Sequence, residues 1–344
     1  MRYRLRTLLI VLAVGPVVLA GAGLRIAAAD EAPARALPET IEQVLNWLPE
    51  DTETVIAVQS FELALPPKSN DVVPVGPFDL KLLIDSLALG EWDHDKYLKP
   101  LLGQKVKLAL CGGRQFETVS SFGTLRSENC AIIVFDKNLD EAGTKWTDNV
   151  RKGAKETREI AGREVFVFPS TIDGDGAYKA KPWQGTYVLM LKPDTLLCAS
   201  SDRYLAEVLR RVDETPQSRA LVDNLPEWKL VDPRAPAWMV RHIPANSGRL
   251  VTGLVWTWKN DRLEVIYLPD AQRMGKKIEE AITARWRPSD LPAPGDAKPD
   301  RVLLRPDGTV SVSITTKILE FDKAFLRGMH IYVLQGENGY VGAR

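Results

Sequence analysis

The chain has 344 residues, of which 45 are basic and 45 acidic, and 45% of all residues are hydrophobic. This composition is ordinary for a globular protein, and the length suffices for one large domain or two medium ones. The first 29 residues contain four arginines and no acidic residue, which leaves 41 basic against 45 acidic side chains in the remainder. That acidic balance argues against binding to nucleic acid, which needs a basic surface, and against strong adhesion to anionic lipid.

The N-terminus has the layout of a secretory signal. Arginines precede an uncharged run over residues 7–24, and three alanines stand directly before Asp30. This order predicts a signal peptide over residues 1–29 and export to the periplasm or cell envelope. The uncharged run has 18 residues, close to the lower limit of the roughly 17–25 that a membrane-spanning helix needs. Retention as an N-terminal membrane anchor is therefore the alternative, and a buried helix of a cytosolic protein is the third interpretation.

Local patterns predict the elements up to residue 212. Residues 30–39 form a Pro- and Ala-rich spacer, and helical spacing then predicts a helix over residues 40–48 with Thr40 as its N-cap. Further helices are expected over residues 79–89, 140–154 and 202–212, the last with Ser201 as its N-cap. Short apolar runs predict strands at residues 54–58, 106–111, 131–135, 187–191 and 195–199. Ala161-Gly162 lies between two such runs and predicts a β-hairpin.

The last third of the chain is rich in hairpin signals. Asn260-Asp261 separates two expected strands at residues 254–258 and 263–268, and the turn at residues 306–308 separates two more at 302–304 and 310–315. A helix is expected between these hairpins, over residues 271–286. Regular alternation of strand and helix is missing, so the fold class expected is α+β, with mainly antiparallel, hairpin-rich sheet and helices packed on one face.

Two parts are expected after the spacer. Residues 40–232 are expected to form an α+β domain, and residues 233–344 a hairpin-rich subdomain that is either separate or continuous with it. LPEDTETVIAVQS at residues 48–60 resembles LKPDTLLCASS at 191–201, and NWLPED at 46–51 resembles DNLPEW at 223–228. Internal duplication is one explanation. The other is that Pro-x-Asp-Thr is a common way to turn into a strand.

The cysteines match no zinc or redox motif. Cys111, Cys130 and Cys198 each lie in or beside an apolar, strand-like run, so we interpret them as small buried hydrophobic residues. An exported chain could form a disulfide, and the odd number would leave at least one thiol without a partner in the same chain. Because the first cysteine is Cys111, lipoprotein processing near the leader is excluded.

No residue pattern predicts a catalytic, metal or cofactor site. The cluster over residues 91–95, which contains His94, is interpreted as a solvated turn, and His242 and His330 as histidines of a core or a strand edge. The acidic pair in residues 173–176 lacks the later ligands of a calcium loop. The segment at residues 275–277 lacks the rest of a phosphate loop, and no Gly-x-Ser-x-Gly motif occurs.

Tryptophan is the remaining candidate for ligand contact. Trp256 and Trp258 are two residues apart, so they share one face of a strand. Such a stripe could stack on a sugar ring, but core packing under a helix is the more common arrangement.

The chain resembles a group of exported, uncharacterised envelope proteins of planctomycete bacteria. The resemblance rests on the leader RYRLRTLLIVLAVGPVVLAG, on WLPEDTETVIAVQ with its Leu-Pro-x-Asp-Thr turn, and on the segment TYVLMLKPDTLLCASSDRYLAEVLRRV. It extends over about residues 1–245, with RALVDNLPEWKLVDPRAPAWMVRH near its end. The group implies export and an envelope domain, and it implies no activity, cofactor or site residue.

The sequence therefore predicts an exported envelope protein that is non-enzymatic and acts through contacts with an envelope protein or glycan. An exported hydrolase with a site assembled from distant residues is one alternative. A carbohydrate-binding module that uses exposed tryptophans is the other.

Overall fold

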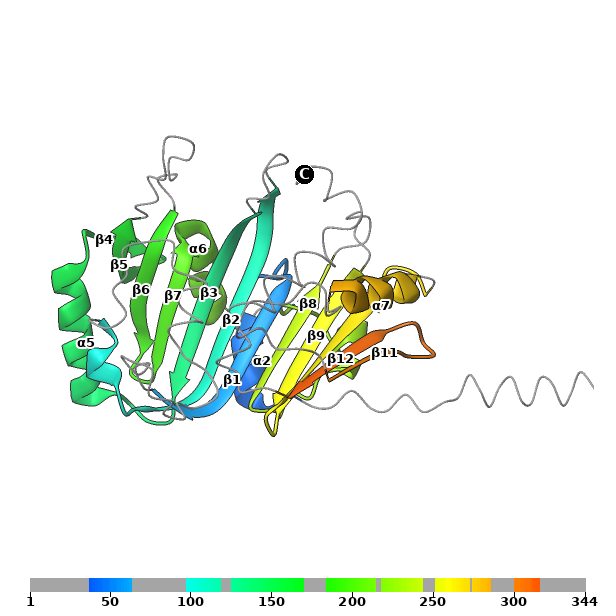
Figure 1. Ribbon diagram of the computed structural model, residues 1–344. Helices are drawn as coiled ribbons and strands as arrows, with labels where there is room; N and C mark the ends of the chain where they lie inside the picture. The colour runs from blue at the N-terminus through cyan, green and yellow to red at the C-terminus, as the bar shows by residue number, and fades with distance from the viewer. Residues whose placement is uncertain are drawn as a thin grey trace, which may run out of the picture. The chain divides into compact units, whose positions relative to one another are not determined.

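In the computed structural model, the residues described are 37–63, 97–118, 125–169, 184–214, 218–243, 251–272, 274–285 and 300–315. Within them, twelve strands form one antiparallel sheet in the order β11-β12-β10-β9-β8-β1-β2-β3-β7-β6-β5-β4 (Figure 1). The strands are β1 (Thr54–Glu62), β2 (Lys105–Thr118), β3 (Leu125–Phe135), β4 (Glu156–Ile160), β5 (Arg163–Pro169), β6 (Gln184–Lys192), β7 (Thr195–Ser201), β8 (Ala237–His242), β9 (Val251–Lys259), β10 (Arg262–Pro269), β11 (Arg301–Leu304) and β12 (Val310–Thr315). The helices are α2 (Glu39–Trp47), α5 (Asp140–Gly153), α6 (Asp202–Asp213) and α7 (Met274–Arg285), with 3-10 turns η1 (Lys99–Leu101) and η2 (Pro226–Lys229).

The predicted hairpins and helices are present wherever the structure describes the chain. Ala161 and Gly162, which join β4 to β5, both have positive φ, and so do Asn260 and Asp261 between β9 and β10. Ser201 is the N-cap of α6 as expected, and its side chain accepts a hydrogen bond from the Tyr204 amide. The expected helix over residues 79–89 and the expected signal peptide lie outside the described residues.

The first helix begins slightly earlier than expected. Its N-cap is Pro38 and not Thr40, and α2 runs from Glu39 to Trp47. The predicted apolar stripe is nevertheless buried, including Ile41 and Val44. Pro38 supplies no side-chain cap, but its carbonyl oxygen accepts hydrogen bonds from the amides of Ile41 and Glu42 and so begins the helix.

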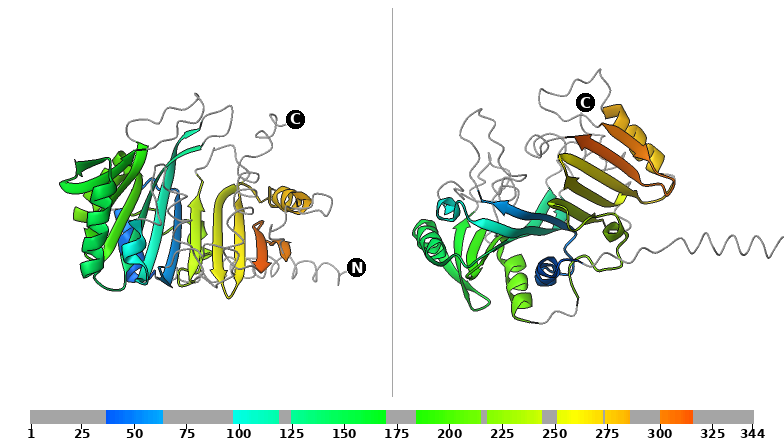
Figure 2. Two further views of the ribbon diagram at one scale, coloured as in Figure 1. Left: turned by 60° about the vertical axis from the view of Figure 1, so that its left-hand side comes forward. Right: turned by 90° about the horizontal axis from the view of Figure 1, so that it is seen from below.

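The sheet is antiparallel, as expected, but the helices cover both of its faces. On β1, Val55 and Ala57 pack into one hydrophobic cluster with α2 and α6, while Val58 packs into a second cluster with α5 and α7. We call the two sides of the sheet the α6 face and the α5 face (Figure 2). The expectation of helices on one face is therefore wrong.

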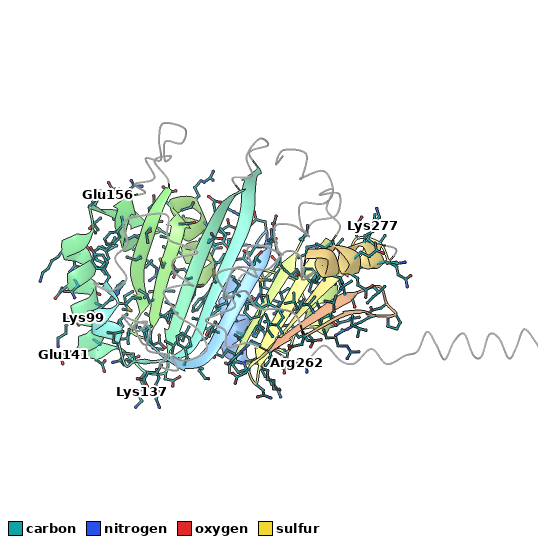
Figure 3. All side chains as sticks on the ribbon, in the orientation of Figure 1. Lys99, Lys137, Glu141, Glu156, Arg262 and Lys277 are labelled. Atoms are coloured by element: carbon teal, nitrogen blue, oxygen red, sulfur yellow. The ribbon has the colours of Figure 1, made fainter. Side chains whose placement is uncertain are left out.

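The burial of β7 agrees with helices on both faces of the sheet. Every residue of TLLCASS in β7 is buried, whereas a sheet that is covered on one face only would show alternating exposure. Many charged side chains are exposed on the outside of the molecule. Examples are Glu141 on α5, Glu156 on β4 and Lys277 on α7 (Figure 3).

The order of strands repeats within the chain. The first half runs through β1, β2, β3, helix α5 and two hairpins, and its last strand β7 lies beside β3. The second half runs through β8, β9, β10, helix α7 and one hairpin, and its last strand β12 lies beside β10. The two halves meet where β1 pairs antiparallel with β8. The similar segments NWLPED and DNLPEW precede these two strands, so the topology is that of an internal duplication with the hairpin β4–β5 added to the first half.

A second similarity supports the duplication. Lys192-Pro193-Asp194-Thr195 joins β6 to β7, and Arg305-Pro306-Asp307-Gly308-Thr309 joins β11 to β12 at the corresponding place. In both turns the threonine hydroxyl donates a hydrogen bond to the carboxylate of the aspartate, over 2.8 Å and 2.7 Å. The other similar pair of segments, residues 48–60 and 191–201, falls on β1 and on the hairpin β6–β7, which are not equivalent positions.

The described residues from Leu37 onward belong to one compact unit. Strands from the expected domain at residues 40–232 and from the expected subdomain at residues 233–344 share the same sheet through the pairing of Val55 with Val240 and its neighbours. The hairpin-rich part is thus continuous with the preceding part within the described residues.

Candidate functional site

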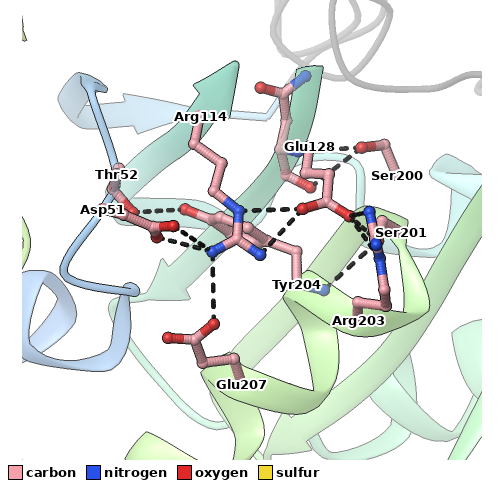
Figure 4. Close-up of polar contacts among 10 residues, drawn as sticks. Asp51, Thr52, Arg114, Glu128, Ser200, Ser201, Arg203, Tyr204 and Glu207 are labelled. Carbon is pink, nitrogen blue, oxygen red and sulfur yellow. Dashed lines mark hydrogen bonds and ion pairs between the residues drawn. The ribbon is translucent and has the colours of Figure 1, made fainter. Parts of the chain in front are cut away.

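A polar cluster joins the start of β1, the strands β2, β3 and β7, and helix α6 (Figure 4). Its members are Asp51, Thr52, Arg114, Glu128, Ser201, Arg203, Tyr204 and Glu207. Strand register brings them together: Arg114 lies opposite Glu128 in the β2–β3 pair, and β3 is paired in turn with β7, whose last residue caps α6. We call this group the polar cluster.

The carboxylate of Glu128 is the buried centre of the polar cluster. The residue is 1% exposed, and its Oε1 accepts hydrogen bonds from Ser201 Oγ at 2.7 Å and from Arg203 Nη2 at 2.8 Å. Its Oε2 accepts a hydrogen bond from Arg114 Nε at 2.9 Å. Burial alone would raise the pKa of Glu128, but these donors outweigh burial and hold the pKa below its usual value.

The guanidinium group of Arg114 connects Glu128 to the outer carboxylates. Its Nη1 donates to both carboxylate oxygens of Asp51 at 2.7 Å and lies 3.5 Å from Glu207 Oε2. Its Cζ lies 5.1 Å from the centre of the Tyr204 ring. Burial opposes the charge, yet the hydrogen bonds with Asp51 and Glu128 raise the pKa of Arg114 above its usual value.

The hydroxyl groups of the polar cluster are also engaged. Tyr204 Oη and Thr52 Oγ1 share a hydrogen bond of 2.7 Å, and burial raises the pKa of Tyr204 well above its usual value. Ser201 Oγ donates to Glu128 and accepts from the Tyr204 amide.

This arrangement is suited to holding the fold together. A carboxylate with a lowered pKa is a weak base, so Glu128 is poorly placed to activate the Ser201 hydroxyl as a nucleophile. The arginines and carboxylates satisfy one another by charge-assisted hydrogen bonds, which are stronger than neutral ones. The polar cluster ties α6 to the end of the central strands at which β1 begins, and its groups have partners within the fold.

A second pair of groups lies near the end of β8. Glu227, in η2, is fully buried, and its Oε1 lies 2.9 Å from Nδ1 of His242, the last residue of β8. The Glu227 carboxylate packs against Gly253, where a Cβ atom would collide with it. Glu227 Oε2 has no hydrogen-bond partner among the described residues. The His242 side chain is 35% exposed, so a buried carboxylate orients an imidazole that reaches solvent.

His242 is thus a histidine at a strand end, as the sequence indicated, while its pairing with Glu227 was not foreseen. The two residues are only 15 positions apart, but the intervening segment contains no regular pattern that would predict their contact. His94, His330 and the acidic groups at residues 91–95 and 173–176 lie outside the described residues. Gly275-Lys276-Lys277 forms part of the first turn of α7.

The tryptophan stripe belongs to the core. Trp256 and Trp258 are 3% and 9% exposed and pack into the hydrophobic cluster of the α5 face. The core interpretation is therefore correct, and the idea of a carbohydrate-binding surface made by these two rings is wrong.

The three cysteines are buried and free. Cys111 on β2 and Cys198 on β7 both lie opposite Ala131 on β3, so a whole strand separates them. Two strand spacings are about 9–10 Å, too far for a disulfide. Cys130 neighbours Ala131 in β3 and packs into the opposite face of the sheet.

No group of three metal-binding side chains occurs among the residues that the structure describes. None of the helices in that part of the chain is long and apolar enough to cross a membrane. No family model, curated protein or solved structure matches this chain.

Proposed function

We propose that the chain is an exported protein of the cell envelope that acts through contacts with other envelope components and not through catalysis. The leader pattern supports export, because a basic segment, an apolar run and a small-residue site stand in the order of a signal peptide. The acidic balance after residue 29 favours protein or glycan partners over nucleic acid.

The closed arrangement of the polar cluster carries the non-enzymatic part of the proposal. Both oxygens of Glu128 accept hydrogen bonds from side chains of the fold, and Arg114 is shared between Glu128 and Asp51. A substrate-binding site keeps polar groups available for the ligand. Here the same kinds of groups are directed at one another, which favours a stabilising role.

An exported hydrolase is the second candidate, and the Glu227–His242 pair favours it. A carboxylate that binds Nδ1 of a histidine fixes the ring and leaves Nε2 for proton transfer. Oε2 of Glu227 is buried and has no hydrogen-bond partner among the residues that the structure describes, which is unusual for a residue with a structural role only.

Two measurements on one preparation separate the candidates. The chain, expressed with its own leader and a C-terminal tag, is purified from the envelope fraction beside a matched His242→Ala variant. The proposal predicts no hydrolysis of ester, glycoside or peptide substrates above the variant's level, and the same cross-linked envelope partners for both proteins. Turnover that is lost in His242→Ala would overturn the non-enzymatic assignment, and recovery of the chain from the cytoplasm alone would overturn export.

A further inference from the structure

Strand β11 is the last strand at one edge of the sheet that the described residues form. Arg301, Val302, Leu303 and Leu304 pair with β12 on one side, and no described strand lies on the other side. Val302 and Leu304 pack toward the cluster of the α5 face, and Leu303 therefore points to the α6 face. Leu303 is 36% exposed.

The duplication shows which strand lies beside the equivalent strand in the first half. There, β6 corresponds to β11. Each begins the last hairpin of its half, and each lies outside the strand that pairs with the third strand of its half. The outer side of β6 is occupied by β5, through pairs such as Phe166 with Val188. Among the residues that the structure describes, the second half has no counterpart of β5 beside β11.

The two edges of the sheet differ in chemistry. The opposite edge, β4, has the sequence ETREI, in which Glu156, Arg158 and Glu159 are charged. Charges on an edge strand discourage the addition of another strand. Strand β11 has the sequence RVLL, with one charge at its start, and it lacks this protection.

We propose that β11 pairs with β11 of a second copy of this chain, so that two sheets join edge to edge. The inference rests on the proposed function, because it names a surface for the contacts suggested there. Its precedent is the β1–β8 pair, where the two related halves of the chain already meet by antiparallel pairing of equivalent strands. A two-fold axis through such a pair places both copies of Leu303 on the same face of the joined sheet.

The chemistry of β11 is self-complementary in this arrangement. Centred on Leu303, the pairing sets the two leucine side chains opposite each other, with Cβ atoms about 4.5–5.5 Å apart. The contact removes an exposed leucine and the free backbone groups of each edge from water. Since β11 has four residues, the interface is small, and we expect weak, reversible association.

Light scattering after size-exclusion chromatography of the chain purified from the envelope tests the pairing. We expect the mass to rise toward twice that of the monomer with increasing concentration. Leu303→Lys should remain a monomer, because it adds a charge at the centre of the edge. Val222→Lys is the matched control. Val222 is 44% exposed and lies just before η2, which packs against β8 and β9 and not against β11, so this variant should dimerise like the wild type. Circular dichroism confirms that both variants are folded.

A cysteine pair provides a second readout. Leu303→Cys should form a disulfide-linked dimer on mild oxidation, and Val222→Cys should not. The three native thiols are buried, so they should not contribute to this crosslink. A wild-type monomer at all concentrations, a Leu303→Lys dimer, or a Val222→Lys monomer would each overturn the proposal. A monomer that still captures an envelope partner would overturn this interface and leave the proposed function standing.

Discussion

Ser201 Oγ donates a hydrogen bond of 2.7 Å to Oε1 of Glu128, and it also accepts one from the Tyr204 amide. One hydroxyl group thus caps helix α6 and binds the buried carboxylate of strand β3. The contact fixes the first turn of α6 on the sheet, beside Arg114 and Arg203.

The buried carboxylate should be essential to stability at neutral pH. We predict that Glu128→Gln lowers the free energy of unfolding by about 3 kcal/mol or more, because Arg114 and Ser201 lose a charged partner in the interior. Urea unfolding at pH 7 measures this. Glu141→Gln is the matched control, since Glu141 is exposed and pairs with Lys145 one turn along α5. Equal midpoints for Glu128→Gln and the wild type would contradict the prediction.

The unfolding free energies of the wild type and of Glu128→Gln should converge in acid. The folded state holds the pKa of Glu128 below its usual 4.5, so its contribution is complete above the unfolded pKa and is lost as the pH falls through the folded one. We therefore predict that the difference in unfolding free energy between wild type and Glu128→Gln shrinks as the pH is lowered below about 4.5. A difference that is independent of pH between 7 and the acid limit of folding would refute this role of the charge.

Gly275 should not tolerate a side chain although it lies in a helix. A glycine-to-alanine change within a helix ordinarily stabilises it by about 1 kcal/mol. A Cβ at Gly275 would collide with the backbone oxygen of Gly308 in the β11–β12 turn. We predict that Gly275→Ala destabilises the chain by about 1–3 kcal/mol. Thermal unfolding measures whether Gly275→Ala lowers the stability. Gly143→Ala is the control, because a Cβ at Gly143 would meet no backbone atom.

The cysteines should remain thiols even in an oxidising compartment. Burial raises the pKa of Cys111 and of Cys198 to about 12 and also raises that of Cys130. Thiolates are the reactive form. We predict that a thiol-reactive dye labels none of the three in the native protein and all three in urea. Rapid labelling without denaturant, or a disulfide found by mass spectrometry, would show that this part of the core opens.

Glu227 and His242 should be energetically coupled. Removing the imidazole in His242→Ala takes away the hydrogen bond at Oε1 of the buried Glu227 carboxylate, which costs about 1–3 kcal/mol. Glu227→Leu in the same chain removes the carboxylate as well, so the double variant should recover part of that loss. Unfolding of the two single variants and the double variant gives the coupling energy, which we expect to be about 1–3 kcal/mol. Additive effects would mean that the pair contributes nothing.

The sequence predicts the local elements well because their signals are local. Ala161-Gly162 and Asn260-Asp261 are turns with positive φ, and each joins two strands that pair directly. The N-cap at Ser201 is found for the same reason, because a serine before an apolar helical pattern is a short-range signal.

The polar cluster could not be predicted in this way. Glu128 meets Ser201 across 73 positions, and Asp51 meets Arg114 across 63. These contacts depend on the register of β2 against β3 and on the insertion of β7 beside β3, which no single segment encodes. The coverage of both sheet faces is a different case. The four consecutive apolar residues Leu196–Ala199 in β7 already indicate burial on both sides.

Photo-crosslinking in living cells tests the central proposal most directly, with a photoreactive amino acid in place of Leu303 or Val222 in the chain with its own leader. We predict that position 303 gives a crosslinked product of about twice the monomer mass in the envelope fraction, and that position 222 does not. A product confined to the cytoplasm, or no crosslink from position 303, would contradict an exported protein that acts through contacts at this edge.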